Sequence, residues 1–149
     1  MNIKNIDIKI IKWLRAAFLP MARIAIFIIF FWFGALKLLD LSPAGPLADA
    51  LVTKTFGVGN FDVLFQILAI FECIIGILFL FPKFTRIVIP LLFIHMAVVC
   101  SPLFLVPELT WSKPFVPTLE GQYIIKNVAI MALAIGIAAQ APPLLKKKK

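Results

Sequence analysis

The chain has 149 residues, of which 62% are hydrophobic and 15% charged, and its mean hydropathy is +1.06. Soluble domains are roughly half apolar and carry a polar face on most elements, so this composition excludes an ordinary soluble fold. The net charge of +8 could indicate a nucleic-acid partner, but the basic residues gather at the two ends and in one short turn. That distribution is typical of membrane topology and argues against nucleic-acid binding.

Residues 1–20 form a basic arm ahead of the first apolar run. Apolar residues recur there every three to four positions, and Lys9, Lys12 and Arg15 fall elsewhere on the same helical wheel. This pattern predicts a cytoplasmic amphipathic helix that lies on an anionic leaflet and ends at Pro20. A cleaved signal peptide is the competing interpretation, which the lack of a small-x-small cleavage site disfavours.

Four apolar runs of about 20 residues follow, each long enough to cross a ~30 Å hydrocarbon core. The predicted membrane domain covers residues 21–141, with spans at about 21–39, 61–81, 86–105 and 123–141. The expected fold class is therefore all-α, an integral membrane four-helix bundle with an N-terminal amphipathic interfacial helix.

The connections between the spans also predict local structure. The turn at 82–85 is so short that the second and third spans must be antiparallel neighbours, and Pro102 should kink or end the third span. Asn60 is predicted to cap the second span, and a short helix is expected around 47–55. Trp111 in the last long connection is expected to anchor at the membrane interface.

The distribution of Lys and Arg sets the expected orientation. Eleven of the fifteen basic residues fall on one side of a four-span chain: in the arm and the entry of the first span, in and beside the short turn, and in the basic tail at 142–149. Positive-inside logic places both termini in the cytoplasm and both long loops outside. The terminal lysines could alternatively be a dilysine retrieval signal in a eukaryote.

Charged side chains inside the spans are the candidate functional residues, because charges in a membrane are expensive. At a rise of about 1.5 Å per residue, Glu72 and His95 lie ~13 Å from the cytoplasmic edge, near the midplane. Lys37 and Lys126 lie ~21–23 Å from that edge, in the outer third. The predicted binding or buried polar cluster comprises Lys37, Glu72, His95, Glu120, Lys126 and Asn127.

Simpler interpretations stand beside this cluster. Lys37 and Lys126 could snorkel to the interface, and a single histidine is often only a packing residue. Glu72 could be a structural group in a buried pair with Lys37 or Lys126. Gly34, Gly76 and the pair Ala132 and Gly136 are small residues expected at close helix contacts. No catalytic motif is found, and one histidine with two separated cysteines makes no ordinary zinc site, so no metal is expected.

Three segments resemble the DoxX-like superfamily of small four-helix membrane proteins, and most closely its YkgB-type branch. They are FWFGALKLLD in the first span, FECIIGILFL in the second and TLEGQYIIKNVAI at the start of the fourth. Polar and small positions carry the likeness, and these are Gly34, Lys37, Glu72, Gly76, Glu120, Gly121, Lys126 and Asn127.

The resemblance implies a four-helix bundle in a bacterial inner membrane and a link to redox physiology and oxidative stress. The chain is then expected to be a membrane subunit of a quinone-associated complex, without chemistry of its own. No cofactor is evident in the sequence, although apolar walls with a few donors could bind a quinone. The expected partners are membrane lipid and either another protein or further copies of this chain. A non-redox scaffold or assembly protein and a small-molecule transporter are the alternatives.

Overall fold

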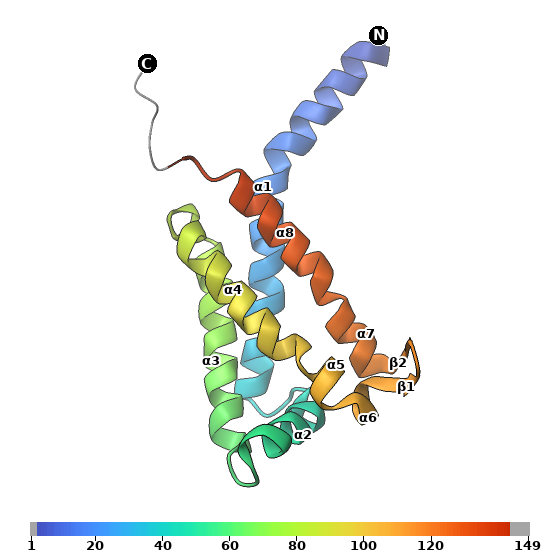
Figure 1. Cartoon of the computed structure of the whole chain (residues 1–149). Helices are drawn as coiled ribbons and strands as arrows, with labels where there is room; N and C mark the ends of the chain where they lie inside the picture. The colour runs from blue at the N-terminus through green and yellow to red at the C-terminus, as the bar shows by residue number, and fades with distance from the viewer. Residues whose placement is uncertain (1–2, 144–149) are drawn as a thin grey trace.

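The computed structural model describes residues 3–143, and the chain there is almost entirely helical (Figure 1). The elements are α1 (Ile3–Leu38), α2 (Gly45–Phe56), α3 (Phe61–Phe79), a 3-10 turn η1 (Pro82–Phe84), α4 (Thr85–Cys100), α5 (Pro102–Leu105), α6 (Pro107–Thr110), β1 (Trp111–Lys113), β2 (Val116–Pro117), α7 (Leu119–Ile125) and α8 (Asn127–Ala139). The predicted all-α class is therefore correct except for one small antiparallel hairpin, β1–β2.

Within residues 3–143, four helical segments are long and apolar enough to cross a membrane. They run over Ile3–Leu38, Phe61–Phe79, Pro82–Leu105 and Leu119–Ala139. The third segment breaks where the sequence predicted, because α4 ends at Cys100 and Pro102 opens α5. The fourth begins four residues earlier than expected and contains a turn at Lys126 between α7 and α8.

Helix α1 runs without a break through Pro20, so the prediction that the arm ends at Pro20 is wrong. A proline removes only one backbone hydrogen bond, and long apolar helices tolerate it when the residues on both sides favour helix. The N-terminal part of α1 projects beyond the other helices, with Ile10 and Leu14 exposed (Figure 1). The helix ends in a Schellman motif in which Asp40 takes a left-handed φ of 54°.

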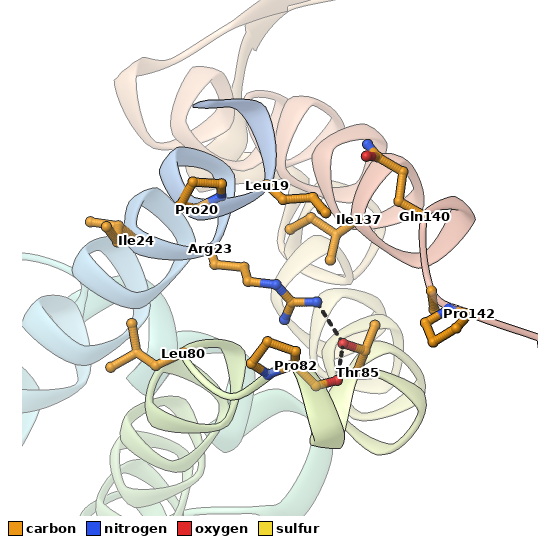
Figure 2. Close-up of a pocket in the computed structure, with 11 residues that line it drawn as sticks. Leu19, Pro20, Arg23, Ile24, Leu80, Pro82, Thr85, Ile137, Gln140 and Pro142 are labelled. Atoms are coloured by element: carbon orange, nitrogen blue, oxygen red, sulfur yellow. Dashed lines mark hydrogen bonds between the residues drawn. The ribbon is translucent and has the colours of Figure 1, made fainter. Parts of the chain in front are cut away.

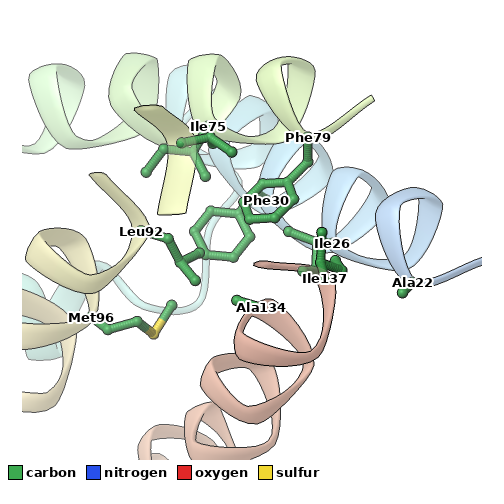
Figure 3. Close-up of a cluster of buried hydrophobic side chains, with 10 residues drawn as sticks. Ala22, Ile26, Phe30, Ile75, Phe79, Leu92, Met96, Ala134 and Ile137 are labelled. Atoms are coloured by element: carbon green, nitrogen blue, oxygen red, sulfur yellow. The ribbon is translucent and has the colours of Figure 1, made fainter. Parts of the chain in front are cut away.

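The apolar core joins all four long segments (Figure 3). Phe30 and Ile26 of α1 meet Ile75 and Phe79 of α3, while α4 and α8 close the other side with residues such as Leu92. Helix α1 packs most extensively on α3, and α4 packs on both α3 and α8. The antiparallel pairing of the second and third segments is thus confirmed.

The connections gather at the end opposite the α3–α4 turn (Figure 1). The predicted short helix is present as α2, but Asn60 does not cap α3. Its amide instead donates to the carbonyl of Phe56 at 3.0 Å, at the C-terminus of the preceding helix. Trp111 lies in β1, where its indole N–H donates to the carbonyl of Leu103 at 2.9 Å. Lys54 and Glu108 form an exposed ion pair at 3.3 Å between the two connections.

Glycines mark the closest approach between α1 and α3. A Cβ on Gly34 would lie 2.7 Å from Cys73 Sγ and 2.8 Å from the carbonyl oxygen of Ala69. A Cβ on Gly76 would lie 2.9 Å from the backbone nitrogen of Phe31. Both predicted packing glycines therefore lie at close helix contacts.

Of the two small residues predicted to pack in the fourth span, only Gly136 lies at a helix contact. Gly136 packs against the ring of Phe18, which a Cβ would approach to 3.2 Å. Ala132 is exposed, and the buried residues of α8 are Ala134 and Ile137. The correction follows from helical periodicity, since Ala132 lies about 200° from Ala134 around the helix and so faces away from the core.

Candidate functional site: a buried lysine–glutamate–histidine triad

Glu72 lies at the centre of a polar triad built from three different helices. Lys37 of α1 donates from Nζ to Glu72 Oε2 at 2.6 Å. His95 of α4 places Nε2 3.3 Å from the other carboxylate oxygen, Glu72 Oε1. The three residues are only 7%, 6% and 3% exposed, so the triad is enclosed by the protein.

The direction of the helices explains why Lys37 reaches Glu72. Side chains on an α-helix tilt toward its N-terminus, and α1 and α3 are antiparallel neighbours. Lys37, near the C-terminal end of α1, therefore extends back toward the middle of the helices, while Glu72 extends toward Lys37. The two groups meet although their Cα atoms lie at different heights, and Gly34 lets the two backbones approach closely enough.

His95 completes the triad from an aromatic setting. Its ring lies edge-on to Phe30, with centroids 5.4 Å apart, and 6.0 Å from the ring of Phe71. Its Nδ1 is the buried side-chain polar atom left without a hydrogen-bond partner among residues 3–143. A carboxylate beside Nε2 favours a proton there, so Nδ1 in the neutral ring is an acceptor that could take a hydrogen bond from a ligand.

The other predicted members of the cluster lie apart from the triad. Lys126 is exposed and holds Nζ 3.9 Å from the centroid of the Tyr123 ring, one turn earlier in the same segment. Glu120 is exposed and Asn127 is half-buried, and among residues 3–143 neither forms a hydrogen bond or ion pair with the triad. Of the two pairings left open for Glu72, the structure thus has the pair with Lys37. Snorkelling toward the end of a segment fits Lys126 and not Lys37.

A second buried basic residue was not singled out from the sequence. Arg23 of α1 is 8% exposed and donates from Nη1 to the carbonyl of Phe79 at 3.0 Å and from Nη2 to Thr85 Oγ1 at 2.7 Å. Its position just inside the first span made it one of the topology charges. The signal that could have found it is its depth, three residues past Pro20 and one turn before the buried Ile26.

Gly121 is a further position whose structural role the sequence alone did not indicate. A Cβ there would lie 2.1 Å from the carbonyl oxygen of Thr110, so the residue must be glycine for α6 to sit against α7. Thr118 fixes the same junction, because its hydroxyl accepts from the Gly121 N–H at 3.2 Å and donates to the carbonyl of Leu109 at 2.7 Å.

Comparison with protein-family models, curated proteins and solved structures gave no match for this chain.

Proposed function

We propose that this protein is a small integral membrane subunit, DoxX-like in its four-helix bundle, of a redox-linked and quinone-associated complex, with no chemistry of its own. The observation that carries the proposal is the enclosed triad. Lys37 and His95 both contact Glu72, so the charged side chains of the triad are paired with one another. A network whose charged groups already contact one another fixes the positions of three helices, which suits a structural subunit without a catalytic role.

The redox link rests on the resemblance, and the fold supports it in one respect. Four of the residues that carry the likeness lie together where α1 crosses α3. Lys37 pairs with Glu72, and Gly34 and Gly76 provide the close approach on either side. Half of the positions that carry the likeness therefore belong to one structural unit, the α1–α3 contact, and the other half lie in the fourth segment.

His95 is the residue proposed to meet a quinone. Its free Nδ1 can accept a hydrogen bond from a quinol hydroxyl, or donate one to a quinone carbonyl when the ring is doubly protonated. Phe30 and Phe71 already pack against the imidazole and would suit a flat ring beside it. A head group would have to enter between helices, because the histidine is enclosed.

Quinone binding to the purified protein tests this proposal. We expect a short-chain quinone to raise the unfolding temperature saturably in mild detergent, followed through Trp32 and Trp111 fluorescence. His95→Phe keeps an aromatic ring but removes Nδ1, and should abolish the effect. Lys126→Met is the matched control, because Lys126 lies outside the triad, and it should leave quinone binding intact. An effect that survives His95→Phe would contradict the assignment to His95.

A non-redox scaffold is the second candidate, favoured by two observations. The helices close fully around the triad, as a purely structural network requires, and the N-terminal part of α1 presents exposed apolar residues beyond the other helices. Purification from the native membrane in mild detergent separates the two candidates. A co-purifying quinone-linked dehydrogenase supports the redox subunit. A partner protein that raises the unfolding temperature, while quinone leaves it unchanged, supports the scaffold.

A further inference from the structure

A groove of 560 Å³ lies at the end of the molecule where the α3–α4 turn meets α1 and α8 (Figure 2). Its walls are apolar and come from three segments, with Leu19 and Ile24 from α1, Leu80 after α3 and Ile137 from α8. Arg23 points into the space between these walls (Figure 2). This groove is separate from the triad, whose three residues do not line it.

The charge of Arg23 is unbalanced within the described part of the chain. Its guanidinium donates to one backbone carbonyl and one threonine hydroxyl, both neutral acceptors, and no carboxylate of residues 3–143 lies within ion-pair distance. A guanidinium has five N–H donors, so these two bonds leave donors unused. Burying a charge without a counter-charge is costly, and the cost falls when an anion occupies the site.

We propose that this groove binds an anionic phospholipid, with Arg23 holding the headgroup phosphate and the apolar walls receiving an acyl chain. Guanidinium and phosphate match in charge and in hydrogen-bond geometry. Basic pockets between membrane helices are a recurrent type of site for anionic headgroups. The inference does not depend on the redox proposal, because it uses neither the triad nor a partner protein.

The surroundings of the groove favour an anion over a cationic or zwitterionic headgroup. None of the eleven residues that line it is acidic. Lys83 is exposed on the adjacent α3–α4 turn, and Arg86 is exposed in the first turn of α4. Arg86 also donates to the carbonyl of Pro142 beside the groove. The basic residues of the turn would thus draw anionic lipid toward the end of the helices where Arg23 lies.

The test compares phosphatidylglycerol with phosphatidylcholine of the same acyl chains, added to the full-length protein in neutral detergent. Native mass spectrometry measures retained lipid, and intrinsic fluorescence measures the unfolding temperature. We expect the wild-type protein to retain phosphatidylglycerol over phosphatidylcholine by at least about fivefold, which is what one basic residue supplies near an anionic surface. Arg23→Gln should remove that preference. Lys83→Gln removes an exposed charge nearby and should keep it.

Two further measurements keep the test decisive. If Arg23→Gln fails to fold, Ile24→Trp fills the half-exposed wall while leaving Arg23 in place, and it should reduce phosphatidylglycerol retention. Inorganic phosphate should not reproduce the stabilisation, since it lacks an acyl chain. Equal retention of the two lipids by wild type or an unchanged preference in folded Arg23→Gln would overturn the proposal. Undiminished phosphatidylglycerol retention in Ile24→Trp, an equal loss of preference in Lys83→Gln, or the same stabilisation by inorganic phosphate would also overturn it.

Discussion

Glu72 is the residue on which the interior polar network depends, because it contacts both Lys37 and His95. Two opposite charges in an apolar interior attract each other strongly, but each has also lost its hydration. The net stabilisation from such a pair is therefore small, whereas the loss from removing one partner is large. A large loss of stability on removing one partner would therefore identify a structural pair, whereas a carboxylate that serves only binding or proton transfer could be replaced without that loss.

Glu72→Gln tests the pair directly. We expect the substitution to lower the free energy of unfolding by ~3–5 kcal/mol, because it leaves the Lys37 charge buried without a partner. Adding Lys37→Met should restore part of that loss. Unfolding by SDS or heat in mild detergent, followed by tryptophan fluorescence, provides the measurement.

The matched controls use the predicted cluster members that lie outside the triad. Glu120→Gln changes an exposed carboxylate and should alter stability little. Lys126→Met should not rescue Glu72→Gln, since Lys126 contacts Tyr123. A stable Glu72→Gln protein would show that the pair is not needed for folding.

The members of the triad could be predicted only in part from the sequence. Depth along each span brought Glu72 and His95 to one level, and the structure joins them. The same measure placed Lys37 and Lys126 at similar heights and could not choose between them. The missing physical term was side-chain direction, which sends Lys37 inward on one helix and Lys126 outward, toward Tyr123, on another.

At the scale of elements, the contact between α1 and α3 depends on backbone proximity. Gly34 lies one turn before Lys37, against the backbone of α3. Any side chain there would push the helices apart at the level where Lys37 must reach Glu72. Packing and ion pairing on this face are therefore coupled.

Gly34→Ala should weaken the α1–α3 contact. The added Cβ would meet the carbonyl oxygen of Ala69 at 2.8 Å, which forces the backbones to move, and we expect a loss of about 1–3 kcal/mol in the free energy of unfolding. Gly45→Ala is the control, because nothing lies within 4 Å of the added group, and it should be close to neutral. The same detergent unfolding assay measures both, and equal effects would contradict the interpretation.

Thr118 provides a second test at this scale, where α7 begins. Its hydroxyl caps the helix and also bonds to the carbonyl of Leu109, so Thr118→Ala should cost about 1–2 kcal/mol. Thr55→Ala removes an exposed hydroxyl that bonds only within α2 and should cost less. Hydrogen exchange at Gly121 should also speed up in Thr118→Ala, and unchanged protection there would argue against the cap.

The elements divide into those that hydropathy predicts and those that depend on local geometry. The cores of all four long segments and the break at Pro102 followed from apolar runs and proline. The continuity of α1 through Pro20 could not be predicted in this way. A proline removes one backbone hydrogen bond, and the helix continues where the residues on both sides of the proline favour helix. The β1–β2 hairpin was not predicted either, since its few paired residues give no alternating pattern of apolar and polar residues.

At the scale of the whole molecule, the two ends differ in chemistry. One end carries the basic residues of the α3–α4 turn and the groove around Arg23. The opposite end carries the long connections, with α2, the hairpin and the Lys54–Glu108 pair. Apolar side chains are exposed between the ends, such as Ile70 and Ile94, where a membrane would cover them. The basic tail at 144–149 lies outside the described residues.

This asymmetry predicts the orientation, with both termini and the α3–α4 turn in the cytoplasm. Single cysteines placed at residues 50 and 112 should react with an impermeant thiol reagent in intact cells, and one at residue 84 should react only after lysis. The wild-type chain gives the background from Cys73 and Cys100, which are free and half-buried. The groove makes the outcome informative beyond topology, because positive-inside orientation places Arg23 in the leaflet facing the cytoplasm. Labelling at residue 84 but not at residue 50 in intact cells would show that the protein has the opposite orientation, with the groove in the outer leaflet.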